Sequence, residues 1–403
     1  MRLAQFCSCQ VLRVGVLMAN AVVGACMDVA ERIVEPSPPV VPAGAATSTG
    51  QAVRPVVAKP RAARKSTQPR GLTVKQWLSR RLADICGVIA TTVPLRAGYW
   101  CADRMGDLFY RFSPGYRGNV ADNLQHVLGP DAGQDLVRAK ARQAFRNSSR
   151  NFYDLMRVRR LPAAELQQSI VVLGDWGPID AALARGKGII FITGHLGAFD
   201  FAGQIIPLHG YRTVLVTVRT VSEFLHEGVT QLRISKGYEI DEPTPGGVRR
   251  LMKTLRQGGT IGLATDRDFL RNGVPVRFFD EETTLPVGAV RFALETGAPI
   301  VPVICRRHGT RHTAVIEEPH WLTRTGRKSS ELDADIQRGL AWLTEVFERH
   351  IRAAPEQWVM FQRVWPATPP PAIAVFPVGS PLEGRVLGGE ASSKAAEPPP
   401  PPP

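Results

Sequence analysis

Cysteine is scarce in this chain, and its spacing excludes several kinds of site. No C-x-x-C pair occurs, and no histidine cluster lies near a cysteine. A zinc site or a disulfide framework is therefore not predicted. We expect no metal and no cofactor. The cysteines are expected to be scattered, reduced thiols in a protein that faces the cytoplasm. The six cysteines are Cys7, Cys9, Cys26, Cys86, Cys101 and Cys305.

The sequence also lacks the common nucleophile and nucleotide motifs. It contains no G-x-S-x-G elbow, no P-loop and no G-x-G-x-x-G. These absences argue against a serine hydrolase and against a nucleotide-binding enzyme of the usual types.

Acidic residues are missing from residues 51–81, where nine Lys or Arg stand. The whole chain carries a formal net charge of +14, and this excess favours an anionic partner such as nucleic acid, an anionic membrane surface or an acidic protein. The basic stretch has a single aromatic, Trp77, and so lacks the series of interleaved aromatics that single-strand binders use as a stacking platform; no nucleic-acid partner is expected.

The uncharged run of residues 14–27 is too short to span a bilayer comfortably, which takes about 20 residues. Residues 14–27 are uncharged, and they are compatible with a signal-like region, an amphipathic anchor or an extension from an early start codon. We expect residues 1–71 to be an extension with a basic, Pro/Ala-rich linker and residues 367–403 to be a Pro-rich tail, both disordered. The folded domain is expected over residues 72–366.

Within that domain, residues 77–100 predict one or two helices interrupted at Pro94. They are compatible with core helices or with a helix lying in a membrane, where the preceding cations would add attraction. From residue 173 onward, short apolar strands alternate with helices, beginning with a helix in 176–186 and a strand in 188–193. This alternation predicts an α/β fold with a mostly parallel sheet covered by helices on both faces.

The pattern His-x-x-x-x-Asp/Glu occurs three times, and only one copy has the context of a site. The three pairs are His126 with Asp131, His195 with Asp200, and His312 with Glu317. His195 follows the buried strand GIIFIT and stands between Gly194 and Gly197, just past the carboxyl end of a strand, where open α/β sheets bind ligands. The glycines would allow a tight turn and a close approach of substrate to the backbone.

We expect His195 to fold back on Asp200 in the first turn of the following helix. A carboxylate on one ring nitrogen fixes the tautomer and raises the basicity of the other, which makes a general base. Because no protein nucleophile accompanies the pair, direct attack of a substrate hydroxyl on an activated acyl group is favoured. A buried histidine with a local partner is the alternative reading.

Several blocks in order resemble one bacterial family. They are RGNVADNLQHVL (117–128), ITGHLGAFDFAG (192–203), ATDRDF (264–269), residues 274–307 and PEQWVMFQRVWP (355–366). Together they resemble the lysophospholipid/lipid A-type acyltransferases, with lipid A lauroyl/myristoyl and phosphatidylinositol mannoside acyltransferases among them. The resemblance implies a glycerolipid-acyltransferase-like fold with a membrane-associating N-terminal helical part.

The resemblance also implies site residues. His195 matches the catalytic histidine and Asp200 its carboxylate partner, while Arg233 matches an arginine that binds phosphate or pantetheine. Asp266 and Asp268 fall in a second acidic motif, closer to the mannoside acyltransferases, and we take both as substrate-binding candidates. Further substrate-binding candidates are Arg219, Gly194 and Gly197.

The implied reaction moves a fatty acyl chain from acyl-CoA or an acyl carrier protein to a hydroxyl of a membrane glycolipid or lysophospholipid. It is expected at the cytoplasmic face of the bacterial inner (plasma) membrane, to which the protein would bind peripherally or through a single N-terminal anchor. Arg306 and Arg307 are expected to form basic surface for the donor. Trp358 and Trp365 are compatible with a core or a membrane-interface role. The alternatives are an acyl-thioester hydrolase and a non-catalytic basic protein that binds membrane or nucleic acid.

Overall fold

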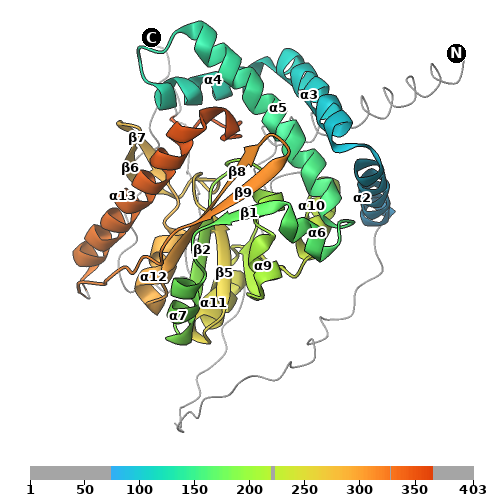
Figure 1. Ribbon diagram of the computed structural model, residues 1–403. Helices are drawn as coiled ribbons and strands as arrows, with labels where there is room; N and C mark the ends of the chain where they lie inside the picture. Colours follow the sequence, from blue (N-terminus) through green and yellow to red (C-terminus); the bar gives the residue numbers. More distant parts are fainter. Residues whose placement is uncertain (1–73, 219–222, 327, 366–403) are drawn as a thin grey trace, which may run out of the picture. The chain divides into compact units, whose positions relative to one another are not determined.

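The computed structural model describes residues 74–218, 223–326 and 328–365 (Figure 1). The helices are α2 (Val74–Thr92), α3 (Leu95–Phe112), α4 (Pro114–Leu128), α5 (Gln134–Val158), α6 (Ala163–Gln168), α7 (Gly177–Ala184), α8 (Phe199–Ala202), α9 (Ile205–His209), α10 (Glu223–Ile234), α11 (Pro245–Arg256), α12 (Gly288–Thr296) and α13 (Ser329–Ala353). The predictions for residues 1–71 and 367–403, and for Arg219, lie outside the described residues.

Short apolar segments form a seven-stranded sheet in the order β1-β9-β8-β2-β5-β3-β4. All neighbours in it run parallel except β8 and β9. The strands are β1 (Ile170–Leu173), β2 (Ile189–Thr193), β3 (Thr213–Val216), β4 (Glu239–Asp241), β5 (Thr260–Ala264), β8 (Ile300–His308) and β9 (Arg311–Ile316), with a separate hairpin of β6 (Val274–Phe278) and β7 (Glu281–Leu285). The predicted α/β fold with a mostly parallel sheet is confirmed.

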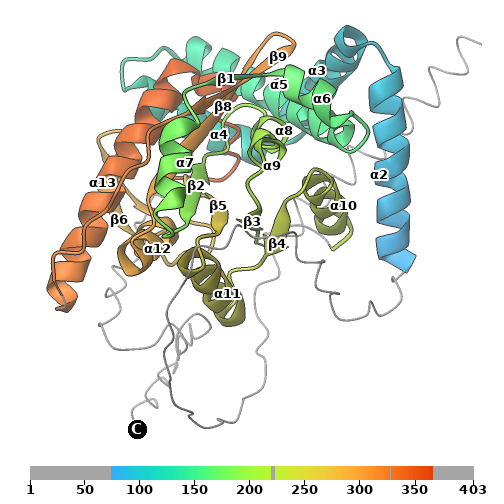
Figure 2. The same cartoon turned by 60° about the horizontal axis from the view of Figure 1, so that its bottom comes forward.

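Alternation along the central strand β2 sends side chains into two separate cores. Ile190 and Ile192 pack with residues of α11, α12 and α13, whereas Ile189 and Phe191 pack with residues of α5 to α9. All four are almost fully buried. Successive strand side chains point to opposite faces, so a continuous apolar run marks a strand covered on both sides. Figures 1 and 2 show these helices on the two faces of the sheet.

Helices α3, α4 and α5 form a further apolar layer with its own core. Pro94 separates α2 from α3, because the residue before a proline is restricted away from the helical region. Gly106 lets α3 approach α5 closely, since a Cβ there would lie 2.6 Å from the Cα of Arg146. Asp103 on α3 accepts two hydrogen bonds from Arg150 on α5, at 2.6 and 2.5 Å, which fixes the pairing of the two helices.

The described residues fall into two units. The smaller unit holds the start of α2, up to Asp84, and the start of α10, up to Gly228; within it Arg80 pairs with Glu227 at 2.6 Å. The larger unit holds the sheet and the other helices. None of the helices described here is long and apolar enough to cross a bilayer. Exposed apolar side chains nevertheless occur on α2 and α3 within the larger unit, among them Ile85, Ile89 and Trp100.

The structure differs from the sequence predictions in particular places. Residues 199–209 form two short helices rather than one, with Gly203 and Gln204 between them. The long helices α5 and α13 were not predicted. Trp358 and Trp365 are 1% and 5% exposed, and they pack in the core with Phe278, so the core interpretation of these tryptophans is correct.

Candidate functional site

The candidate site forms where two parallel neighbours, β2 and β5, end side by side. Thr193 and Ala264, the last residues of the two strands, are register partners, and each strand continues for two residues to reach His195 and Asp266. Nδ1 of His195 lies 2.8 Å from Oδ1 of Asp266. Strand pairing therefore brings together two residues that are 71 positions apart in the sequence.

Asp266 is completely buried and is surrounded by donors. Its Oδ2 accepts hydrogen bonds from the backbone N–H of His195 at 2.7 Å and from the indole N–H of Trp358 at 3.0 Å. Burial alone would raise the pKa of Asp266, but the interaction with His195 and these hydrogen bonds lower it below its ordinary value. The carboxylate is therefore charged at neutral pH and acts only as an acceptor.

This geometry fixes the state of the histidine ring. A carboxylate accepts but does not donate, so in the neutral imidazole Nδ1 carries the hydrogen and Nε2 carries the lone pair. The His195 side chain is 28% exposed, and Phe199 packs edge-on against the ring with centroids 5.1 Å apart. The site thus offers a fixed, solvent-reachable imidazole, which is the arrangement a general base requires.

Asp200 is not the partner of His195, and this corrects the sequence prediction. Its two oxygens accept from Nε and Nη2 of Arg233 at 2.6 and 3.0 Å. The bidentate guanidinium occupies the carboxylate, and Gly197, with φ of +58°, turns the chain between His195 and α8. The residue that contacts the ring of His195 is Asp266. A catalytic role for Asp200 and a substrate-binding role for Arg233 stay predictions.

The backbone around His195 is held on every side. Its carbonyl accepts from the N–H of Val359 at 2.9 Å, and the N–H of Gly197 donates to the carbonyl of Gln357 at 2.9 Å. Leu196 forms an isolated β-bridge with Trp358. The carbonyl of Gly197 accepts from the side-chain amide of Asn151 at 2.6 Å. The loop is thus fixed by the segment after α13 on one side and by α5 on the other.

The bracketing glycines make room for protein atoms. A Cβ at Gly194 would lie 3.1 Å from Oδ2 of Asp266 and 3.1 Å from the ring of Phe347, and one at Gly197 would lie 2.5 Å from the carbonyl oxygen of Cys305. The expected tight turn is present at Gly197. The close neighbours of both positions belong to the chain itself. Substrate binding at Gly194 and Gly197 stays a prediction.

Asn151 contacts a buried ion pair formed by Arg307 and Asp154. Nη2 of Arg307 donates to Oδ1 of Asn151 at 2.7 Å and to Oδ2 of Asp154 at 2.5 Å, and the hydroxyl of Tyr99 donates to Oδ1 of Asp154 at 2.8 Å. Asp154 is fully buried, and this burial raises its pKa. His312 lies beside the pair, and its pKa is lowered to about 3 by burial and by Arg307. We name Tyr99, Asn151, Asp154 and Arg307 the polar layer.

The remaining predicted residues have structural contacts. Oδ2 of Asp268 accepts from the N–H of Gly273 at 2.9 Å and from the hydroxyl of Thr284 at 3.0 Å, so this carboxylate closes the turn before β6. Arg307 is 5% exposed, which corrects its assignment to a basic surface, and Arg306 contacts Nδ1 of His350 at 2.9 Å. Asn151 was not predicted from the sequence, and Asp266 was predicted to bind substrate rather than the ring of His195.

The two other His-x-x-x-x-Asp/Glu pairs do not form contacts. His126 pairs with Glu281 at 2.8 Å, while His312 belongs beside the polar layer and Glu317 pairs with His350 at 2.6 Å. Reading both patterns as chance spacings is therefore correct. Among the residues that the structure describes, no group of three or more His, Cys, Asp or Glu could hold a metal ion.

Comparison with known proteins defines this chain as an acyltransferase. The model of the family described as bacterial lipid A biosynthesis acyltransferase matches residues 64–366, and the chain belongs to that family. Two phosphatidylinositol mannoside acyltransferases of Mycobacterium tuberculosis, from strains H37Rv and CDC 1551, are 31% and 32% identical over 250 and 252 residues, with 60% of this chain and 75% of each relative covered. The enzyme of the same name from Mycolicibacterium smegmatis is 29% identical over 250 residues, covering 60% and 77%. The family recognised in the sequence is confirmed.

Replacing Asp200 by Asn tests the Asp200–Arg233 contact. The substitution keeps the size of the side chain but removes the charge from a half-buried bidentate pair, so we expect the melting temperature to fall by roughly 3–10 °C. Asp135→Asn is the matched control, because its partner Arg138 is equally close at 2.7 Å but both side chains are mostly exposed. Calorimetry should show almost no change for the control. An equal shift for both variants would contradict the structural role of the Asp200 pair.

Replacing Asn151 by Asp tests the hold on the His195 loop. The variant still accepts from Arg307 but no longer donates to the carbonyl of Gly197, so the loop loses one anchor. We expect kcat for acyl transfer to fall roughly ten- to hundredfold with little change in KM, because a small displacement of a reacting group is expensive. Asn119→Asp is the matched control, since Asn119 donates in the same way to the carbonyl of Phe361 at 3.1 Å. Full kcat in the Asn151 variant contradicts the prediction.

Proposed function

We propose that this enzyme transfers a fatty acyl chain from a thioester to a hydroxyl of a glycolipid, with His195 as the general base and Asp266 as its orienting carboxylate. One observation carries the proposal: Nδ1 of a partly exposed imidazole lies 2.8 Å from a fully buried, charged carboxylate at the carboxyl edge of a parallel sheet. Family membership makes the enzyme an acyltransferase, and this pair supplies a base suited to that chemistry.

The proposed reaction needs no covalent enzyme intermediate. Nε2 of His195 takes the proton of the acceptor hydroxyl as its oxygen attacks the thioester carbonyl. The tetrahedral intermediate then collapses, the carbon–sulfur bond breaks, and the imidazolium returns the proton to the departing thiolate. Asp266 stabilises the imidazolium between these two steps and stays ionised throughout. An ester and a free thiol are the products.

The family and its relatives support a proposal for the substrates. The donor is an acyl thioester, either acyl-CoA or an acyl-loaded carrier protein. Three relatives at 29–32% identity are named phosphatidylinositol mannoside acyltransferases, and this favours a sugar hydroxyl of a mannose-bearing glycolipid as the acceptor. Arg233 is held by Asp200 close to the chain turn that follows His195, which keeps it a candidate for contact with a phosphate of the donor.

We further propose that the enzyme works at the cytoplasmic face of the bacterial inner membrane, where it binds as a peripheral protein. Within the larger unit, Ile85, Val88 and Ile89 on α2 are 56%, 40% and 51% exposed, and Trp100 and Phe112 on α3 are 63% and 66% exposed. Exposed aliphatic and aromatic side chains on helices, beside arginines, are typical of elements that lie in a membrane interface.

Replacing each member of the base pair tests the mechanism. His195→Ala removes the base and is expected to lower kcat about 10²- to 10⁴-fold, the usual contribution of general-base catalysis. Asp266→Asn is expected to cause a loss of similar size, because an amide placed against Nδ1 can donate and so favours the wrong tautomer. Transfer of radiolabelled acyl chain to extracted glycolipid measures both variants, with circular dichroism as the check on folding. Full activity of folded His195→Ala contradicts the base assignment.

The products decide between transferase and thioester hydrolase. We expect purified enzyme to release thiol from acyl-CoA much faster when glycolipid is present, and to release almost no free fatty acid, because the acceptor oxygen outcompetes water. Mass spectrometry of lipids from cells with and without the gene then identifies the acceptor as the species that is lighter by one acyl chain in the deletion. Equal fatty acid release with and without glycolipid would favour the hydrolase.

A further inference from the structure

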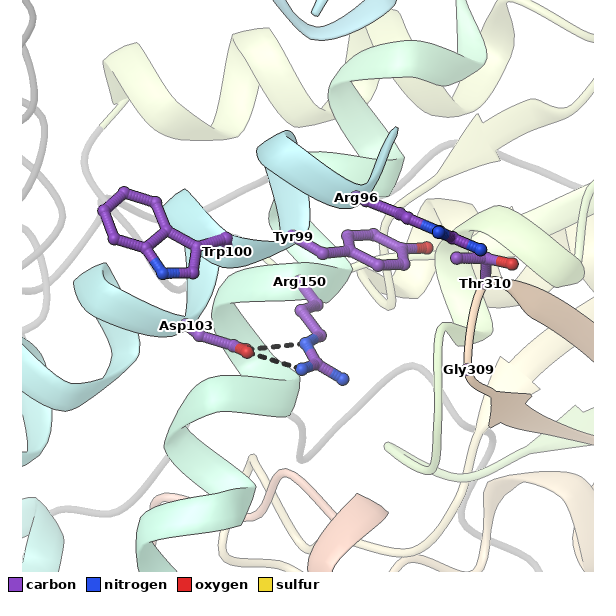
Figure 3. A pocket seen from close by; sticks show the side chains of 7 residues that line it. All are labelled: Arg96, Tyr99, Trp100, Asp103, Arg150, Gly309 and Thr310. Carbon is purple, nitrogen blue, oxygen red and sulfur yellow. Dashed lines mark hydrogen bonds and ion pairs between the residues drawn. The ribbon is translucent and has the colours of Figure 1, made fainter. Parts of the chain in front are cut away.

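A cavity lies apart from the His195 loop. It has a volume of about 260 Å³ and lies between α3, α5 and the turn that joins β8 to β9. Figure 3 shows Arg96 and Thr310 at one end of the cavity, the Asp103–Arg150 pair at the other, and the ring of Tyr99 between them. All of its lining residues belong to the larger unit.

The polar layer connects one wall of this cavity with the loop that follows His195. The hydroxyl of Tyr99 points inward to Asp154, and the layer continues through Arg307 and Asn151 to the carbonyl of Gly197. Neither His195 nor Asp266 is among the residues that line the cavity. The occupant is not the reacting hydroxyl or thioester, and nothing in the acyl transfer proposed above uses the cavity.

The lining offers an excess of donors. Its one carboxylate, Asp103, already accepts two hydrogen bonds from Arg150. Arg96, the indole N–H of Trp100 and the hydroxyl of Thr310 have no hydrogen bond or ion pair with any part of the chain that the structure describes. The lining thus holds two guanidinium groups and one carboxylate, and each of the three side chains without a partner can donate a hydrogen bond. A ligand that only accepts hydrogen bonds and carries negative charge matches this lining.

The cavity also opens beside an unusual helix face. Arg96, Trp100, Arg104 and Leu108 recur every four residues on α3, so they share one side of the helix, and Trp100 is 63% exposed. Alternating arginine and apolar side chains suit the boundary between lipid and water, where guanidinium groups meet phosphates. This location favours a phosphate attached to a larger molecule over a free carboxylate.

We propose that the cavity between α3, α5 and the β8–β9 turn binds a phosphate ester, with Arg96 and Thr310 as its principal donors. The phosphate is carried either by a lipid headgroup or by a soluble molecule, and both present the same oxygens to the donors. The proposal is independent of the acyl transfer reaction, because its measurements are of binding rather than of activity.

Two variants and one control test the site in the full chain. Arg96→Ala removes a donor cation, and Thr310→Glu places a carboxylate at the same end of the cavity. Arg256→Ala is the matched control, because Arg256 is an exposed arginine at the end of α11 without an ion pair to any described residue. It removes the same charge from a different surface of the larger unit. Circular dichroism confirms the fold of each variant.

The first arm measures flotation with phosphatidylcholine vesicles that do or do not contain phosphatidylglycerol. We expect both cavity variants to bind the anionic vesicles roughly five- to tenfold more weakly than the parent chain, and the control to change much less. The second arm measures the melting temperature in millimolar glycerol 3-phosphate against sodium chloride of equal ionic strength. A ligand that binds the folded state raises the melting temperature, and the cavity variants should lose that rise if the phosphate is soluble.

The outcomes separate the two sources and the failure of the proposal. Effects of the cavity variants in the vesicle arm assign the phosphate to a lipid, and effects in the soluble arm alone assign it to a small phosphoester. The proposal is overturned when both cavity variants match Arg256→Ala in both arms. Acyl transfer activity enters neither arm, so a failure here leaves the His195 proposal unaffected, and the reverse also holds.

Discussion

The hydrogen bonds of one buried carboxylate hold the candidate site together. Asp266 follows β5, accepts from the backbone and ring of His195 after β2, and accepts from Trp358 beyond α13. Taking a carboxylate out of water costs several kcal/mol unless donors replace the lost hydration. Here three N–H groups do so, and each comes from a segment that the site needs in place. Losing this anion would release the imidazole and the loop together.

Each acid near the loop has its own cationic or ring partner, and this division sets the roles. Asp266 contacts His195, Asp200 contacts Arg233, and Asp154 contacts Arg307. A carboxylate that already accepts a bidentate guanidinium has little capacity left for an imidazole. Arg233 and Arg307 each contact a carboxylate of their own and not Asp266. The ring of His195 contacts the carboxylate of Asp266.

The sequence predicted the frame of the site better than its contacts. The apolar run before His195 identifies a strand covered on both faces, so the position of the histidine at the sheet edge was predictable. Its partner was not, because a five-residue spacing suggested a local contact, whereas the real one depends on β2 and β5 being parallel neighbours. A signal was present: His195 and Asp266 each stand two residues past a strand. Arg307 lies in a strand of mostly buried residues, and this context, rather than its charge, determines its burial.

The polar layer is easier to explain by orientation than by stability. A buried ion pair usually contributes little to stability compared with apolar residues of the same volume, because desolvation offsets the attraction. Asp154 and Arg307 are nevertheless buried. Arg307 donates to Oδ1 of Asn151, and the side-chain N–H of Asn151 donates to the carbonyl of Gly197. Apolar residues in place of Asp154 and Arg307 would fill the same space but would not orient the amide of Asn151 toward the carbonyl of Gly197. The ion pair therefore orients the side chain that holds the loop beside His195. Tyr99, which donates to Asp154, also lines the cavity between α3, α5 and the β8–β9 turn.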